Sequence, residues 1–160
     1  MALGRSPYLK FGFSPSNEDY AIVEKYASEM GVSEYLNFNF NQLSGGQKQL
    51  VTITRALIQE TPIIILDEPM SALDIGKQAE LLLTINELKK NGKTIILTSH
   101  NPNHALQCNC NVCLIDKGHI IGYGKSIDVL TRQNIESVYG SNVTIEKGNV
   151  TFNLKAKLYK

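Results

Sequence analysis

Apolar residues recur at helical spacing in three stretches of the chain, over residues 16–30, 44–57 and 77–90. In the first stretch, the apolar positions are Ile22, Val23, Tyr26, Ala27 and Met30. The second stretch opens with Ser44 and Gln47, whose spacing is that of a capping box. The pattern therefore predicts three amphipathic helices, with a shorter helical turn at 33–36 between the first two.

Two short apolar runs rich in β-branched residues lie at residues 62–66 and 94–99. Their apolar residues are continuous rather than alternating, which is typical of strands buried on both faces of a parallel sheet. A strand, a crossover helix and a second strand in this order predict an α/β fold with a right-handed connection.

The last third of the chain is predicted to hold a hairpin and two short helices. The hairpin spans residues 111–123 and turns at Lys117 and Gly118. The helices lie near residues 126–130 and 131–139, and a polar tail with strand-like alternation follows.

Composition and charge narrow the class of protein. The 160 residues are 42 % apolar and 19 % charged, as in an ordinary folded domain. The formal net charge is +1 and the longest basic run is Lys89-Lys90, which argues against a nucleic-acid partner. Because no apolar run approaches the roughly 20 residues that span a bilayer, and no signal core lies near the N-terminus, we expect a cytoplasmic chain.

Three cysteines, Cys108, Cys110 and Cys113, lie close enough in sequence to suggest a metal or redox site. Their odd number and the lack of a second cluster argue against a disulfide framework and against a zinc site. We predict instead that Cys113 belongs to a buried strand over residues 112–115.

Polar residues that could carry chemistry follow both predicted parallel strands. Asp67 and Glu68 come directly after the first strand, and His100 follows the second. Functional groups gather beyond the carboxyl ends of such strands, and neighbouring carboxylates can face a metal and an attacking water separately. Taken alone, these residues also fit a solvated loop and a partly buried histidine.

The second predicted helix begins with Ser44, Gly45, Gly46 and Gln47. These residues would cap the helix without any ligand. Two glycines at a helix N-terminus also expose backbone amides toward an anion, where the helix dipole favours a phosphate. The local pattern leaves both interpretations open.

Four segments in order resemble the ABC ATPase family over nearly the whole chain. They are similar to its signature motif, Walker B segment, D-loop and switch histidine, and they are Leu43–Gln47, Ile63–Pro69, Ser71–Asp74 and Thr98–His100. The resemblance implies a partial ABC ATPase domain of α/β class, part of a mainly parallel RecA-like sheet with flanking helices. It implies a helical signature subdomain over residues 1–60 and the C-terminal part of the catalytic subdomain over 61–160.

The resemblance also implies roles for individual residues. Glu68 and His100 would be catalytic, as general base and as the γ-phosphate contact, and Asp67 would hold Mg²⁺ through water. Asp74 would lie at a dimer contact. The nucleotide-binding residues would be Ser44, Gly45, Gly46 and Gln47, acting on the ATP of a second subunit. ATP and Mg²⁺ are thus the implied cofactors of the parent protein.

A phosphate-binding loop of the form G-x4-G-K-[ST] is the expected cradle for ATP, and the sequence contains none. The segment from Gly118 to Ser126 is similar but lacks the required first glycine and follows a hairpin. In the family this loop lies upstream of a Gly-Arg-x-Pro segment, which Gly4–Pro7 resembles. We therefore expect a C-terminal fragment that binds no cofactor and is inactive by itself.

The Gly4–Pro7 segment and residues 98–105 resemble importers of iron-siderophore, haem and cobalamin, although Asn101 and Met70 depart from that group's pattern. The parent would then power import while bound to permease subunits at the inner membrane. Two alternatives remain open: a non-catalytic interaction module that pairs with an intact ATPase, and an ABC ATPase that is not part of a transporter. Exposed sheet edges also predict self-association.

Overall fold

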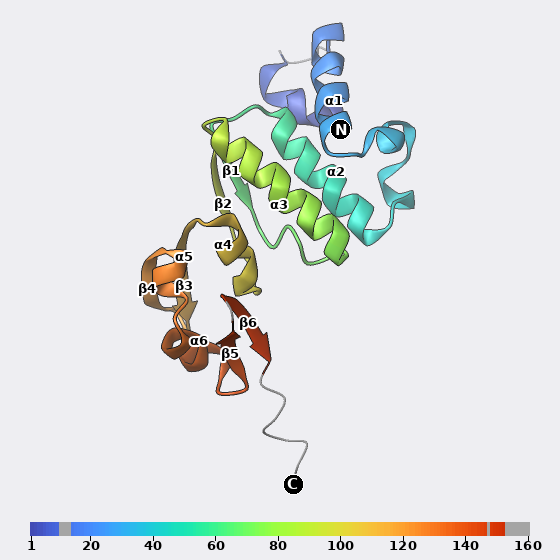
Figure 1. Ribbon diagram of the computed structural model, residues 1–160. Helices are drawn as coiled ribbons and strands as arrows, with labels where there is room; N and C mark the ends of the chain where they lie inside the picture. The colour runs from blue at the N-terminus through green and yellow to red at the C-terminus, as the bar shows by residue number, and fades with distance from the viewer. Residues whose placement is uncertain (10–13, 147, 153–160) are drawn as a thin grey trace. The chain divides into compact units, whose positions relative to one another are not determined.

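The computed structural model describes residues 1–9, 14–146 and 148–152 of the chain (Figure 1). The chain divides into two compact units, Met1–Ser99 and His100–Lys160, and each is described by itself. The sequence suggested a boundary at residue 60 between a helical signature subdomain and part of a catalytic subdomain. That boundary stays a prediction.

The first unit contains the three predicted long helices. Its helical elements are η1 (Ala2–Tyr8), α1 (Asn17–Glu29), η2 (Ser33–Asn37), η3 (Phe40–Gln42), α2 (Gly45–Ile58) and α3 (Ile75–Lys90). Capping boxes begin α1 at Ser16 and α2 at Ser44. Helix α3 begins two residues before the predicted start, because the Asp74 side chain accepts a hydrogen bond from Lys77 N and caps it.

Strands β1 (Ile63–Leu66) and β2 (Thr94–Leu97) pair in parallel, with Ile63 opposite Thr94 and Leu66 opposite Leu97. This confirms the predicted strand, helix and parallel strand. Helix α2 packs against β1 and α3 against β2. These helices bury Ile64 and Leu66, which are 5 % and 8 % exposed.

The opposite face of this sheet is open, so the prediction of burial on both faces was wrong. Ile63, Ile65 and Ile96 are 53 %, 73 % and 54 % exposed and share one face because side chains alternate along a strand. We call these three residues the isoleucine face. Within the described part of Met1–Ser99 no element covers it, since both packed helices serve the other side.

The described part of the second unit combines two hairpins with three helices. Its elements are α4 (Pro102–Cys108), β3 (Asn111–Asp116), β4 (His119–Lys125), α5 (Ser126–Val129), α6 (Arg132–Tyr139), β5 (Val143–Glu146) and β6 (Asn149–Phe152). The first hairpin and the two helices that follow it were predicted, whereas α4 and the pairing of the C-terminal strands were not. The first hairpin turns at Lys117 and Gly118, both with positive φ, and β5 pairs antiparallel with β6. The predicted C-terminal strand pattern is therefore confirmed through residue 152.

Leu114, Val129, Leu130 and Ile135 form the core of the second unit. Only one side of the β3–β4 hairpin faces this core. Leu114 is buried, whereas Cys113 is exposed and Ile115 is 57 % exposed. The expectation of a fully buried strand over residues 112–115 was therefore wrong, because the strand alternates in the way that a half-covered sheet requires.

Candidate functional site

Asp67 and Glu68 lie directly after β1 and are joined by a side chain from the neighbouring strand. The Thr98 hydroxyl donates to Asp67 Oδ1 at 2.6 Å and accepts a hydrogen bond from Glu68 N at 2.9 Å. The strand register explains this arrangement, because Leu66 pairs with Leu97 and Thr98 is the next residue along. The exposed Asp67 carboxylate is thereby oriented at the carboxyl end of the sheet.

The backbone at Glu68 adopts a left-handed conformation, with φ of 43°. Such a value is uncommon for a residue with a side chain and needs support from its surroundings. The Glu68 carbonyl accepts hydrogen bonds from Ser71 Oγ at 3.0 Å and from Gln49 Nε2 at 3.5 Å. The Thr98 hydroxyl accepts a bond from Glu68 N, so the peptide groups before and after the Glu68 Cα are both held.

Ser44, Gly45, Gly46 and Gln47 form the first turn of α2, and the predicted capping box is confirmed. Gln47 N donates to Ser44 Oγ at 3.4 Å, and Ser44 N donates to Gln47 Oε1 at 2.8 Å. The Tyr35 hydroxyl lies 3.2 Å from Gln47 Nε2 and accepts its hydrogen bond. Ser44 and Gly45 are exposed, so the amide-rich end of this helix faces solvent.

The first turn of α2 lies against the segment that leads to Asp74. A Cβ atom on Gly46 would come within 3.0 Å of the Ala72 carbonyl oxygen, so glycine permits the close approach. Gln78 Nε2 fixes the same segment from α3, because it donates to Leu73 O at 3.0 Å. The predicted nucleotide-binding turn and the predicted dimer-contact segment are thus neighbours in one unit.

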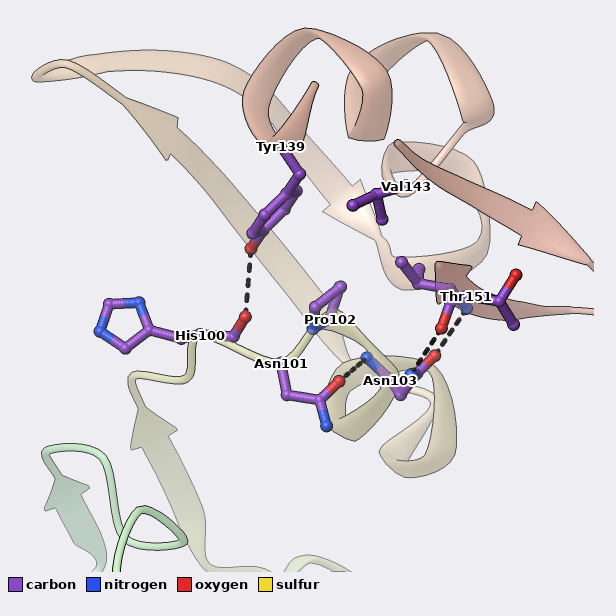
Figure 2. Close-up of a pocket in the computed structure, with 8 residues that line it drawn as sticks. His100, Asn101, Pro102, Asn103, Tyr139, Val143 and Thr151 are labelled. Atoms are coloured by element: carbon purple, nitrogen blue, oxygen red, sulfur yellow. Dashed lines mark hydrogen bonds between the residues drawn. The ribbon is translucent and has the colours of Figure 1, made fainter. Parts of the chain in front are cut away.

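His100 is the first residue of the second unit and is described with it. Its carbonyl oxygen accepts a hydrogen bond from the Tyr139 hydroxyl at 3.4 Å. Figure 2 shows the His100 ring pointing away from Tyr139 and Pro102. The structure thus brings Asp67 and Glu68 together in the first unit, while His100 belongs to the other.

Sequence reasoning missed three side chains that hold these segments: Thr98, Gln49 and Tyr139. Thr98 was readable in principle, because two parallel strands in register place the residue after β2 beside the residue after β1. Gln49 lies two residues past the capping box and contacts Glu68 only through the packing of α2 on β1. Tyr139 follows from tertiary contact alone, and no sequence signal points to it.

Arg5, in the Gly-Arg-x-Pro segment, is a buried ion-pairing residue within the first unit. It donates to Asp19 Oδ1 at 2.8 Å, to the Ile58 carbonyl at 3.1 Å and to Glu60 Oε2 at 3.1 Å. The Arg5 hydrogen bond, followed by bonds from Ser16, lowers the pKa of Asp19 from 3.8 to about 2. Arg5 therefore ties η1 to α1 and α2.

The cysteines and the glycine-rich lookalike segment take ordinary structural positions. Cys108 is buried in α4 and Cys113 is exposed on β3. Over residues 1–9, 14–146 and 148–152, no three His, Cys, Asp or Glu side chains gather as metal ligands would. In the segment from Gly118 to Ser126, Gly118 lies in the hairpin turn, residues 119–125 form β4 and Ser126 begins α5.

None of the helices in the described part of the chain combines the length and the apolar character needed to cross a bilayer. The chain is similar to ATP-binding proteins of transporters. Residues 8–71 match the family model described as ABC transporter. An uncharacterized ABC transporter ATP-binding protein of Haemophilus influenzae is 34 % identical over 137 residues, which cover 86 % of this chain and 52 % of that protein.

Two further relatives are named for import. The iron(3+)-hydroxamate import ATP-binding protein FhuC of Bacillus subtilis is 36 % identical over 87 % of this chain and 52 % of its own length. The vitamin B12 import ATP-binding protein BtuD of Citrobacter koseri is 32 % identical over 80 % of this chain and 54 % of its own length. The chain therefore spans about half the length of the curated relatives it matches.

Solved structures of ABC transporters share the fold. An inward-facing ABC transporter matches with a TM-score of 0.78 and 27 % identity, over 93 % of this chain and 62 % of that one. A dimeric bacterial ABC transporter cassette matches with a TM-score of 0.68 and 28 % identity, over 79 % of this chain and 56 % of that one. The predicted fold class, a partial ABC ATPase domain of α/β type, is confirmed.

Proposed function

We propose that this chain, which carries part of an ABC transporter ATP-binding domain, supplies the signature turn and the hydrolytic carboxylates of an importer ATPase. The observation that carries this proposal is the Thr98 hydroxyl, which orients Asp67 and holds the Glu68 peptide where the two parallel strands end. Phosphoryl transfer depends on such positioning.

The proposal gives a role in ATP hydrolysis to the residues that follow the two parallel strands and to the first turn of α2. Asp67 presents carboxylate oxygens, the ligands that Mg²⁺ prefers, and would hold the ion. Glu68 would accept a proton from the attacking water, and His100 would contact the γ-phosphate. Mg²⁺, when bound, supplies positive charge that stabilises the phosphoryl group during its transfer. Ser44, Gly45, Gly46 and Gln47 would offer the N-terminus of α2 to the phosphates of ATP on a second subunit.

These 160 residues alone should bind Mg-ATP weakly, because none of them forms the G-x4-G-K-[ST] cradle. Isothermal titration calorimetry of Mg-ATP into the purified chain is expected to give no measurable binding. Micromolar affinity, about −8 kcal/mol, would contradict this part of the proposal, because another loop would then have to hold the phosphates.

A chimera tests the catalytic roles directly. The chain would replace the matching segment of Bacillus subtilis FhuC, and ATP hydrolysis and ATP binding would both be measured. In an active chimera, Glu68→Gln should lower kcat by about 10²- to 10⁴-fold and leave ATP binding intact, as expected for loss of a general base. Glu24→Gln, the same change at an exposed position on α1, is the control and should leave kcat unchanged. Equal rates for the two variants would refute the assignment of Glu68.

Similarity to importer relatives supports a proposal for the partners and the place of action. We propose a second ATPase subunit, with contact near Asp74, and permease subunits that hold the assembly at the cytoplasmic side of the inner membrane. An iron chelate, haem or cobalamin is the proposed class of cargo, supported by the similarity to FhuC and BtuD. Relatives named for manganese and molybdate are also similar, so the chimera should be tested for growth on several of these cargoes.

A second candidate function is a non-catalytic module that pairs with an intact ATPase. The isoleucine face favours this alternative, because it offers apolar surface to another chain. The test adds the parent chain or its Glu68→Gln variant to an intact relative and measures the ATPase rate of that relative. If both versions bind and change the rate equally, the result supports this alternative over the catalytic one. An ABC ATPase outside transport is a third candidate, and growth that depends on the chimera and on an imported cargo would exclude it.

A further inference from the structure

Asn103 connects the segment after His100 to the C-terminal hairpin. It lies in the first turn of α4, and its side-chain amide pairs with both backbone groups of Val150 in β6. Asn103 Nδ2 donates to Val150 O at 3.0 Å, and Val150 N donates to Asn103 Oδ1 at 2.7 Å. The amide thus occupies the edge of β6 as the next strand of the sheet would.

A second connection holds the same segment at its other end. The Tyr139 hydroxyl, at the end of α6, donates to the His100 carbonyl at 3.4 Å, as Figure 2 shows. Partial desolvation raises the pKa of Tyr139, which favours the protonated phenol that donates this bond. Between these two points, Asn101 Oδ1 accepts a hydrogen bond from Asn103 N at 3.0 Å and caps α4.

The elements that provide these two contacts belong to the core of the second unit. Val143, Ile145 and Val150 of the β5–β6 hairpin pack against the cluster that contains Ile135 of α6. The segment from His100 to Asn103 borders a hollow of about 390 Å³, whose far wall includes Tyr139, Val143 and Thr151. The hydrogen bonds of Tyr139 and Asn103 thus tie the two ends of this segment to α6 and β6.

We propose that Asn103 and Tyr139 are positioning residues for His100, so that the C-terminal hairpin and α6 set where the histidine ring is presented. Figure 2 is consistent with this arrangement, because the His100 carbonyl faces Tyr139 while the ring points away from the hollow. The importance of this for phosphoryl transfer rests on the proposed function. The positioning itself concerns only contacts within the second unit.

Nuclear magnetic resonance on the isotope-labelled 160-residue chain tests the positioning without any need for ATP hydrolysis. Asn103→Leu removes both hydrogen bonds to Val150 at nearly constant volume. Asn103→Asp keeps the acceptor for Val150 N but loses the donor. We expect Asn103→Leu to speed amide hydrogen exchange at Val150 about tenfold and to shift and broaden the His100 ring signals. The Asp variant should fall between Leu and the parent.

Two further variants complete the design. Tyr139→Phe removes only the bond to the His100 carbonyl and should move the His100 signals while leaving exchange at Val150 unchanged. Gln107→Leu makes the same kind of change at an exposed position of α4 and should move neither signal. Methyl signals of Leu114 and Ile135 report whether the core is intact in each variant.

Unchanged His100 ring signals in the variants would overturn the proposal. If exchange at Val150 accelerates in Asn103→Leu while the His100 ring signals stay unchanged in that variant and in Tyr139→Phe, the hairpin merely packs on α4. In the active chimera, Asn103→Leu should lower kcat with little change in KM for ATP. If the parent chimera is itself inactive, the proposed function fails, whereas the magnetic resonance result on Asn103 still decides the positioning.

Discussion

Thr98→Val removes the hydroxyl that joins Asp67 and Glu68 and keeps the shape of the side chain. Valine preserves the β-branched side chain after β2, so backbone preferences change little. The two bonds lost measure 2.6 Å and 2.9 Å, and both lie at an exposed site. A hydrogen bond contributes about 0.5–1.5 kcal/mol net, so the free energy of unfolding should fall by about 1–2 kcal/mol.

Urea unfolding followed by far-ultraviolet circular dichroism measures this loss, and amide hydrogen exchange at Glu68 reports it locally. Exchange at Glu68 should accelerate about fivefold to tenfold, because its amide loses the hydrogen bond to the Thr98 hydroxyl. Thr98→Ser should restore both values. Thr94→Val is the matched control, an exposed threonine at the start of the strand that precedes Thr98, and should stay within about 0.5 kcal/mol of the parent. Equal behaviour of the two valine variants would refute the bridging role.

Three other predictions concern the folded chain. Gly4→Ala should lower the free energy of unfolding by about 1–3 kcal/mol in urea titrations, because the new Cβ would lie 2.7 Å from the Arg55 carbonyl oxygen; an unchanged midpoint would contradict this. Burial lowers the pKa of His104 below 6.5, so the unfolded chain binds the proton more readily than the folded chain. The free energy of unfolding should therefore decline as pH falls below 6.5. Urea titrations across pH should show a smaller decline for His104→Gln. Ile65→Lys should reduce self-association in light scattering, because Ile65 is the most exposed residue of the isoleucine face, and a monodisperse parent chain would argue against the expectation.

Local rules predicted the elements of this fold well. The capping box at Ser44 and the hairpin turn at Lys117 and Gly118 follow from residues close together in sequence. Each depends on a short-range constraint, such as a side chain that satisfies a helix end or a glycine that permits positive φ. The two apolar runs with a helix between them predicted the parallel pair of strands. The order of strand, helix and strand then limits the possible topologies.

Burial and cross-strand contacts were less accessible to sequence reasoning. The run Ile63–Leu66 has the same composition on both faces, so no pattern indicates which face α2 and α3 leave open. Thr98 required the exact register of the two strands, and Asn103 required the hairpin that ends beyond residue 150. Such contacts join distant parts of the chain and leave no periodic signal.

The left-handed backbone at Glu68 lowers the stability of the fold at the same position that carries the proposed general base. Glycine would relax a conformation that costs other residues about 1–2 kcal/mol, and it would delete the proposed base. Selection of active chimeras for heat resistance alone should therefore enrich glycine at position 68 and lower ATP hydrolysis without unfolding the protein. A survey of stabilised variants would thus identify the backbone strain at this position even if no nucleotide were ever added.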